Sequence, residues 1–341
     1  MLTRRFLMKA LAAALPFATL LGAPATAQEL RQITFVQPSP SAINSFPVFV
    51  AIGEGYFEEE GLDVSVEAVN GSASVLQALS AGQAHFGRPG PGPVIAARAR
   101  DVDAVFIYNV AARSNFGLVV REDSEVQGPE ELGGKVIGTG TADGAEVGFA
   151  RNVMSSFDMR AGEDFTFLTV GDGGPATVAF NSGEMDAYSA STADAAILNQ
   201  RGMPVRDITP AEFARFFGNG IATMGETIRE DRELVEKFGR AFTRAHAFAL
   251  DDANREAVLE HLKEGNPQEG EDAEFQSALF DAVRSKTIPV DRSRGLGYMP
   301  PEVWEEWQAS LVDGGEIDAP LDDLEAAYTN EFVDGWNEAI D

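Results

Sequence analysis

The residue with the clearest ligand-binding chemistry is Arg88, which directly follows a short segment, residues 84–87, that is predicted to form a strand. A guanidinium at the end of such a strand can pair a carboxylate, sulfonate or phosphate through two parallel hydrogen bonds. The alternative is a surface or structural arginine. Residue type and position together predict a site for an anionic group, if the strand end faces a cleft.

Two predicted helix starts could supply further polar contacts. The segment GTGTADG (138–144) opens a helix, so its free backbone N–H groups and the positive end of the helix dipole suit an anionic or polar group. Thr139 and Thr141 add hydroxyl groups there, and Ser72 stands at the start of another helix. Each start also permits a plain helix cap, by Ser72 in one case and by Thr141 or Asp143 in the other.

Aromatic side chains could stack on a flat or apolar ligand. Phe46, Phe116 and Tyr188 are the candidates. Phe46 suits a core equally well, and Phe116 suits a core better because it opens a strand. Tyr188 ends a predicted strand, which favours the cleft.

Other polar candidates fall in loops or where the chain passes between its two halves. Asp194 also suits a helix cap, and Asn109 suits a hinge or a ligand donor. These candidates are Ser39, Asn44, Asn109, Asp172 and Asp194.

No catalytic set stands out in the sequence. The histidines, His85, His246 and His261, fall in separate predicted elements, and no nucleophile elbow, HExxH or Walker loop occurs. GTGTADG is a loose match to a dinucleotide loop, but the acidic residue expected about 20 residues further on is not evident. Without cysteine, a thiolate nucleophile or zinc–thiolate site is excluded. We predict a protein that is not an enzyme, with no cofactor and no metal.

Strand and helix alternate along the first two thirds of the chain, with glycine-rich turns between them, which predicts parallel sheets in an α/β fold. The helix beginning at Phe46 is expected to stop at Gly61. The expected strands are 32–36, 62–69, 84–87, 102–108, 116–120, 135–138, 165–170, 186–190 and 221–224.

A weak internal repeat suggests two lobes of one design. LSAGQAHFG (79–87) aligns with FNSGEMDAY (180–188), each a helix, a glycine and a short strand; a chance match of a common αβ unit is the alternative. We predict lobe I from residues 28–112 and 222–341, and lobe II from 113–221. Two chain crossings then form a hinge suited to closing around a ligand. The helical C-terminal tail, with helices near 234–249, 253–262, 273–283, 301–311 and 321–340, is expected to close lobe I.

The composition of the chain and its N-terminal leader indicate where the protein is located and which partners it has. The chain has 341 residues and a net charge of −28, which argues against nucleic acid or an anionic membrane surface as a partner. Residues 1–27 combine a basic start, a short apolar run and Ala25-Thr26-Ala27, typical of a cleaved signal peptide. Arg4-Arg5 resembles a twin-arginine export motif, and general secretion is the alternative. We expect a soluble protein in the periplasm.

Several segments resemble one protein family over nearly the whole chain. FPVFVAIGEGYFEEEGLDV, NGSASVLQALSAGQAHFG, SNFGLVVREDS, ELGGKVIGTGTADG, SGEMDAYSASTADAAI and YTNEFV carry the resemblance. They resemble periplasmic substrate-binding proteins of ABC importers, in the branch of sulfonate/taurine, nitrate and thiamine-pyrimidine-precursor binders.

The resemblance implies a type II binding-protein fold, a monomer, a small-molecule ligand and an ABC permease as partner. A small organic anion is the first expectation for the ligand, and a pyrimidine precursor or other heteroaromatic is the second. The cysteine-rich motif of the related pyrimidine synthases is missing, which weighs against an exported enzyme. A ligand sensor that signals to a membrane partner is a further alternative.

Overall fold

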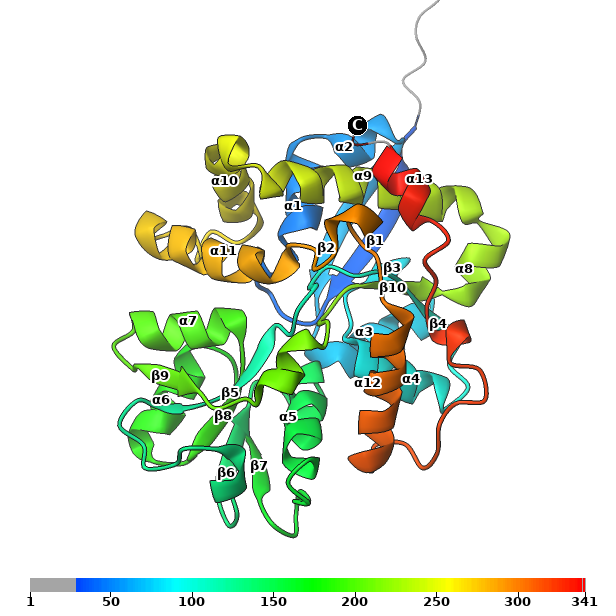
Figure 1. Ribbon diagram of the computed structural model, residues 1–341. Helices are drawn as coiled ribbons and strands as arrows, with labels where there is room; N and C mark the ends of the chain where they lie inside the picture. Colours follow the sequence, from blue (N-terminus) through cyan, green and yellow to red (C-terminus); the bar gives the residue numbers. More distant parts are fainter. Residues whose placement is uncertain (1–28, 339, 341) are drawn as a thin grey trace, which may run out of the picture.

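The molecule consists of two lobes, each built on a five-stranded mixed sheet with helices on its faces (Figure 1). The computed structural model describes residues 29–338 and residue 340, so the predicted signal peptide lies outside the described residues. Within the described part of the chain, no helix is long and apolar enough to span a membrane.

The sheet of lobe I has the strand order β2-β1-β3-β10-β4. β1 pairs in parallel with β2 and β3, whereas β10 runs antiparallel to β3 and β4. The strands are β1 (Arg31–Gln37), β2 (Leu62–Ala68), β3 (Phe86–Gly87), β4 (Ala104–Tyr108) and β10 (Ile221–Met224). The helices between them are η1 (Ile43–Ser45), α1 (Phe46–Gly53), α2 (Tyr56–Glu59), α3 (Gly71–Ser80) and α4 (Pro91–Arg98).

The sheet of lobe II has the order β7-β6-β8-β5-β9, with β6 parallel to β7 and β8, and β5 antiparallel to β8 and β9. The strands are β5 (Phe116–Arg121), β6 (Val136–Thr139), β7 (Thr166–Thr169), β8 (Ala187–Ser191) and β9 (Val205–Asp207). The helices are η2 (Pro129–Glu131), α5 (Ala145–Ser155), α6 (Gly174–Ser182), α7 (Thr192–Gln200) and η3 (Ala211–Arg215). The fourth strand of each sheet follows a chain crossing from the other lobe.

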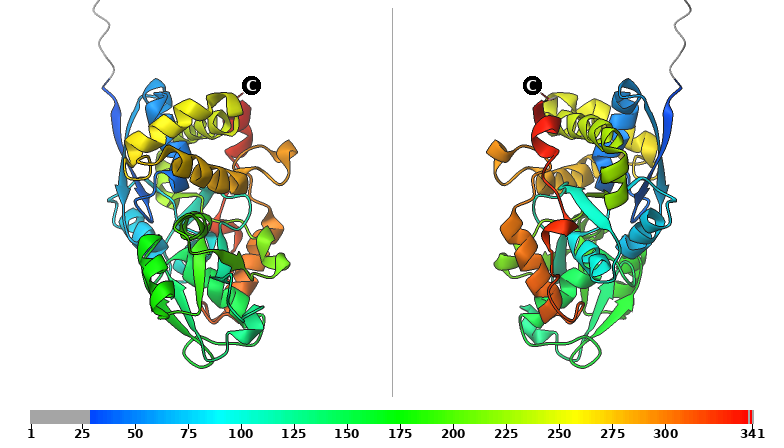
Figure 2. Two further views of the ribbon diagram at one scale, coloured as in Figure 1. Left: turned by 90° about the vertical axis from the view of Figure 1, so that its left-hand side faces the viewer. Right: turned by 90° about the vertical axis from the view of Figure 1, so that its right-hand side faces the viewer.

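The tail after β10 is helical and mostly covers lobe I, with its last helix lying on that lobe (Figure 2). The apolar stripe of α9 drives this packing, because Phe238 stacks on Phe86 with ring centroids 3.9 Å apart. The tail elements are α8 (Gly225–Glu230), α9 (Arg232–Leu250), η4 (Asp252–Asn254), α10 (Arg255–Gly265), α11 (Ala273–Thr287), η5 (Arg292–Arg294), α12 (Pro301–Asp313), η6 (Glu325–Ala327) and α13 (Val333–Glu338).

Three predictions about helices are wrong. The segment from Phe46 to Gly61 is broken at Gly55, whose φ of +75° ends α1 and starts α2. Residues 321–340 do not form one helix, because Asn330 bonds both backbone groups of Met299 and the N–H of Thr329 bonds the carbonyl of Phe106. The tail does not serve lobe I alone, since α12 packs on both α4 and α5.

The two crossing segments, 109–115 and 216–220, run side by side. The N–H of Ala111 donates to the carbonyl of Asn219 at 3.1 Å, and the N–H of Gly218 donates to the carbonyl of Ala111 at 2.8 Å. Asn115 adds a side-chain bond, with Oδ1 accepting from the N–H of Asn219 at 3.1 Å. The lobes are therefore joined by a paired connection.

Candidate functional site

A cleft of about 310 Å³ lies between the lobes. Its walls are the loop after β1, Arg88 after β3, Thr141 after β6, the turn before α6 and the start of α7. Parallel strands bring their carboxyl ends to one edge of a sheet, which is where such sites form. The polar and charged residues that line it are Ser39, Ser41, Asn44, Ser72, Arg88, Asn115, Thr141, Glu146, Asp172, Ser191, Asp194, Arg201, Asn219, Asn266, Gln268 and Glu269.

Helix starts from both lobes converge on this cleft. The starts of α3 and α5 approach each other so closely that a Cβ on Gly71 would lie 3.0 Å from Oδ1 of Asp143 and 3.1 Å from Oγ1 of Thr141. Gly71 also has a φ of +81°, so both the close contacts and the backbone conformation favour glycine there. The positive ends of these helix dipoles favour negative charge in the cleft.

Arg88 is the buried cation of the cleft. Its backbone is fixed, because its N–H donates to the carbonyl of Val36 at 2.9 Å and its carbonyl accepts from Asn219 Nδ2 at 3.3 Å. Only 6% of the residue is exposed, and among the described residues its guanidinium has neither an ion pair nor a hydrogen bond. Burial lowers the pKa of Arg88 to about 10. An anionic ligand would give this charge the partner it lacks.

Lobe II presents carboxyl groups to the same cleft. Asp194 accepts from the N–H of Gly173 at 3.0 Å through Oδ1 and from Ser191 Oγ at 2.6 Å through Oδ2. Burial, and then the neighbouring Asp172, raise the pKa of Asp194 to about 7. Desolvation within the cleft also raises the pKa of Asp172, although this residue keeps an exposed surface. These carboxyls hold protons more readily than exposed ones, and a cationic or hydrogen-bond-donating group would stabilise their ionised forms.

Two further carboxyls hold the edges of the site in place. Glu146, at the start of α5, accepts from the N–H of Thr141 at 2.9 Å and from its hydroxyl at 2.6 Å. Glu269, in the tail, accepts from the N–H of Ile43 at 3.1 Å. Burial is the main cause that raises the pKa of both groups. Each is occupied in ordering a loop of the cleft.

The structure brings most of the predicted ligand-binding residues to this cleft. These are Ser39, Asn44, Ser72, Arg88, Thr141, Asp172 and Asp194. It also places Phe116 in the cleft wall, although the sequence favoured a core position for that residue. Phe46, Asn109, Thr139 and Tyr188 do not line it.

The four misplaced residues have separate physical reasons. Phe46 is fully buried against His246 and Phe280, with ring centroids 5.5 Å apart in both pairs. Thr139 is buried in β6, and Asn109 lines a different cavity on the far side of the crossing segments. Tyr188 is fully buried inside lobe II, where its hydroxyl donates to the carbonyl of Gly171 at 3.2 Å.

The structure shows which of the candidate capping residues do cap a helix. Ser72 does not cap α3, whose N-cap is Asn70; its hydroxyl instead accepts from the N–H of Gly90 at 3.1 Å. Neither Thr141 nor Asp143 caps α5, since the N-cap is Gly144. Asp194 does serve a helix start, as the acidic partner of a capping box with Ser191.

Sequence reasoning missed Glu146, Ser191, Asn115, Asn219 and Glu269. Glu146 lies in the first turn of α5 and Ser191 is the last residue of β8, so their positions carried a usable signal. Glu269 reaches the cleft only because the tail folds back to Ile43, 226 residues away in the chain. Local patterns contain no information about such a contact.

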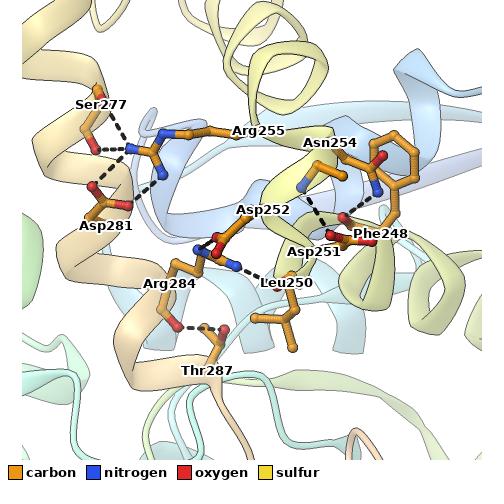
Figure 3. Close-up of polar contacts among 11 residues, drawn as sticks. Phe248, Leu250, Asp251, Asp252, Asn254, Arg255, Ser277, Asp281, Arg284 and Thr287 are labelled. Carbon is orange, nitrogen blue, oxygen red and sulfur yellow. Dashed lines mark hydrogen bonds and ion pairs between the residues drawn. The ribbon is translucent and has the colours of Figure 1, made fainter.

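Helix α7 of lobe II packs on α11 of the tail. Two arginines fix α11 to the rest of lobe I (Figure 3). Arg255 pairs with Asp281 at 2.5 Å, and Arg284 pairs with Asp252 at 2.7 Å. Helix α11 therefore belongs to lobe I, and its contact with α7 is a contact between lobes.

The histidines do not come together in the part of the chain that the structure describes. His246 is buried beside the Tyr108 hydroxyl at 2.9 Å, His261 pairs with Glu54 at 2.7 Å, and His85 accepts from the N–H of Thr34 at 3.1 Å. Within residues 29–338 there is no cluster of three histidine or carboxylate side chains that could hold a metal ion.

Comparison with solved structures confirms the two-lobed α/β fold of type II periplasmic binding proteins. The alkanesulfonate-binding protein SsuA from Xanthomonas axonopodis pv. citri superposes with a TM-score of 0.68 at 15% identity. The match covers 89% of this chain and 99% of that protein.

Sequence comparison identifies relatives that cover most of the chain. The riboflavin-binding protein RibY from Chloroflexus aurantiacus is 25% identical over 319 residues, which is 92% of this chain and 89% of that protein. The 4-amino-5-hydroxymethyl-2-methylpyrimidine phosphate synthase THI11 from Saccharomyces cerevisiae is 22% identical over 330 residues, 86% of this chain and 92% of its own length. The NMT1/THI5-like family model matches residues 42–256, and the chain therefore belongs to the NMT1/THI5-like family.

Proposed function

We propose that this protein is the periplasmic solute-binding component of an ABC importer. It captures a small organic anion of the sulfonate, taurine-like or carboxylate type in the cleft, and closes by hinge motion between lobe I (28–112 and 222–341) and lobe II (113–221). The monomeric protein then delivers the ligand to an inner-membrane permease. No bond is made or broken, so selectivity comes from the difference in ligand affinity between the open and closed forms.

Arg88 is the observation that carries this proposal. A buried guanidinium without a partner is unfavourable, and a bidentate anion would satisfy its planar fork of donors. The helix starts of α3 and α5 add N–H groups and dipoles of the same sign. The named ligand class of the Xanthomonas structural neighbour is consistent with this chemistry.

The carboxyls of lobe II narrow the ligand class further. Asp172 and Asp194 line the cleft together with Arg88. A ligand with an anion at one end and an ammonium or another donor at the other end satisfies both sides. A taurine-like zwitterion therefore fits better than a plain alkanesulfonate.

A pyrimidine thiamine precursor or another heteroaromatic is the alternative ligand. Phe116 in the cleft wall offers an aromatic surface, and the carboxyls could accept from ring amino groups. The names of RibY and of the yeast synthase point to heterocycles. Phe46 and Tyr188 no longer support this alternative, because both are buried elsewhere.

An exported enzyme on the same scaffold is a weaker alternative. It rests on the yeast synthases among the relatives. The chain has no cysteine, and its histidines lie in separate places away from the lining of the cleft. We propose binding without turnover.

Calorimetric titration of the refolded, ligand-free protein tests the proposal. Taurine and ethanesulfonate form a matched pair that differs in the amine, and an aminopyrimidine represents the alternative. Arg88→Ala should reduce the affinity for the anion by about 2–5 kcal/mol, and Arg160→Ala, at an exposed position of lobe II, should leave it unchanged.

The outcomes separate the alternatives. Binding of taurine with ethanesulfonate at least tenfold weaker supports the zwitterion. Aminopyrimidine binding that is indifferent to Arg88→Ala replaces the anion with the heteroaromatic. Unchanged anion affinity in Arg88→Ala contradicts the assignment of Arg88.

A further inference from the structure

A second cavity lies behind the crossing segments, on the side away from the cleft. Its volume is about 700 Å³, within the range of roughly 300–1,000 Å³ that is typical of small-molecule sites. Asn109, Arg113 and Phe217 of the crossing segments form one wall, and the loop from Thr287 to Pro300 forms the other. We refer to it as the hinge cavity.

Hydrogen bonds hold the walls of the hinge cavity together. The N–H of Asn109 donates to the carbonyl of Gly297 at 2.9 Å, and its Nδ2 donates to the carbonyl of Tyr298 at 3.3 Å. At the other end of the loop, Arg113 Nη1 donates to the carbonyl of Ile288 at 2.9 Å. The loop is tied to the crossing segments at both ends, so the cavity is preformed.

The hinge cavity contains an unused hydrogen-bond acceptor. Asn109, which lines the cavity, is only 6% exposed, and its Oδ1 has no hydrogen-bond partner among the described residues. A buried acceptor without a donor destabilises the fold unless something else supplies one. A ligand with an N–H or O–H group would do so.

The same cavity combines an aromatic surface with positive charge. The guanidinium of Arg294 stacks on the ring of Tyr298 at 4.2 Å, and among the described residues it has no ion pair or hydrogen bond. Phe217, Pro289 and the exposed Val290 add apolar surface. Stacked arginine and tyrosine side chains suit a flat ring that carries a negative charge.

The charge of the hinge cavity differs from that of the whole chain. Its lining includes three arginines, Arg113, Arg215 and Arg294, against the two carboxylates of Asp291 and Glu302, in a chain of net charge −28. Arg215 is held by Glu306 at 2.7 Å, which leaves Arg294 as the cation available to a ligand. With Arg215 paired outside the lining, Arg113 and Arg294 stand against Asp291 and Glu302, so the lining is close to neutral in a strongly acidic chain.

We propose that the hinge cavity is a second binding site, which takes an aromatic monoanion bearing a hydrogen-bond donor. The ring lies against Tyr298 and Val290, the anion pairs with Arg294, and the donor reaches Oδ1 of Asn109. This site is separate from the cleft and does not depend on the ligand proposed for the cleft.

Fluorescence titration with 8-anilinonaphthalene-1-sulfonate tests the proposal, because this probe has aromatic rings, one sulfonate and one N–H. Because the probe is itself a sulfonate, the class proposed for the cleft, the titration is done in the Arg88→Ala protein, which should bind it at one saturable site. Arg294→Ala should weaken binding roughly tenfold, and Val290→Asp, at an exposed position, should do the same by placing a carboxylate in the lining.

A matched control keeps the result interpretable. Arg292→Ala removes an exposed arginine from the same loop that does not line the cavity, and should leave the affinity unchanged. Absence of saturable binding, or equal effects of Arg292→Ala and Arg294→Ala, would overturn the proposal.

Discussion

The two lobes share one plan but bring different charged groups to the cleft. Their sheets have the same order of parallel and antiparallel strands, and β3 and β8 occupy equivalent places, which confirms the two-lobed design that the internal repeat predicted. Lobe I contributes the cation Arg88, whereas lobe II contributes the carboxyls of Asp172 and Asp194. The shared plan sets where side chains enter the cleft, and the residues that differ between lobes set what the cleft binds.

The interiors of the two lobes differ in which of two paired strands carries the larger side chain. In lobe I, Val36 stands opposite Gly87 in the sheet, and a Cβ on Gly87 would lie 3.0 Å from Val36 Cγ1. In lobe II, Gly138 stands opposite Tyr188, and a Cβ on Gly138 would lie 3.1 Å from Tyr188 Cδ2. In each lobe one large and one small residue share this space. The large residue is on β1 in lobe I but on β8, the equivalent of β3, in lobe II. This exchange turns Tyr188 into a core residue.

Truncating Tyr188 should have the largest effect on stability. Tyr188→Ala should lower the free energy of unfolding by about 3–5 kcal/mol, because it leaves a cavity in lobe II. Tyr188→Phe loses only the bond to Gly171 and should cost about 0.5–1.5 kcal/mol. Urea denaturation of both variants measures this. If Tyr188→Ala had normal stability but altered ligand affinity, this would contradict the core assignment and make Tyr188 a residue of the cleft.

Asp194 should make lobe II sensitive to pH. Its pKa rises from 3.8 to about 7 in the folded protein, so the folded form binds the proton more tightly than the unfolded form. The stability that this group contributes is fully present below about pH 4 and is lost as the pH rises through about 7. We expect the free energy of unfolding to drop by about 2 kcal/mol between pH 5 and pH 8 through this group.

Asp194→Asn should flatten this slope, although it also weakens the capping box and lowers stability at every pH. Asp164→Asn is the control, because Asp164 is exposed. Urea denaturation at both pH values measures the slope. A slope in Asp194→Asn as steep as in the native protein would show that other buried carboxyls cause it.

Arg88 should lower the stability of the ligand-free protein. Its burial without a partner disfavours the charged form, so Arg88→Met, which keeps much of the volume, should raise the free energy of unfolding by about 1–3 kcal/mol while binding is lost. Arg201→Met, at an exposed position of the same cleft, should change stability by less than about 0.5 kcal/mol. Destabilisation by Arg88→Met would mean that Arg88 has a partner within the protein.

Periodic patterns were sufficient for most of the fold. Strand β10 begins and ends where the alternating apolar residues predicted, and the stripe from Leu234 to Ala249 lies within α9. The pattern failed at Gly55 and at Asn330. At Asn330 a tertiary contact with Met299 outweighs helix propensity, and local sequence does not contain that contact.

The cleft was predictable where it depends on strand ends and helix starts. Arg88, Thr141 and Asp172 follow strands directly, and the fold brings them together. Tyr188 also lies in a strand, but its side chain packs inward, into space that is free because Gly138 has no side chain. That relation involves two strands at once and cannot be read from either alone.

The smallest predicted effect concerns a hydrogen bond that joins two helix starts in each lobe. In lobe I, Ser72 Oγ accepts from the N–H of Gly90. The internal repeat aligns Ser72 with Gly173 and Gly90 with Ser191 in lobe II. There the carboxyl of Asp194 accepts hydrogen bonds from both residues and so connects them. Ser72→Ala should lower the free energy of unfolding by about 1 kcal/mol, because it leaves the buried N–H of Gly90 without an acceptor.

Ser80→Ala, at an exposed position of the same helix, is the control, and it should be neutral or slightly stabilising because alanine favours the helix. Urea denaturation in the absence of ligand measures both variants. Since Ser72 also lines the cleft, a ligand titration separates its two roles: a loss of affinity beyond the loss of stability would mean that the hydroxyl contacts the ligand as well as Gly90. Equal stability of the two variants would show that this hydrogen bond does not stabilise lobe I.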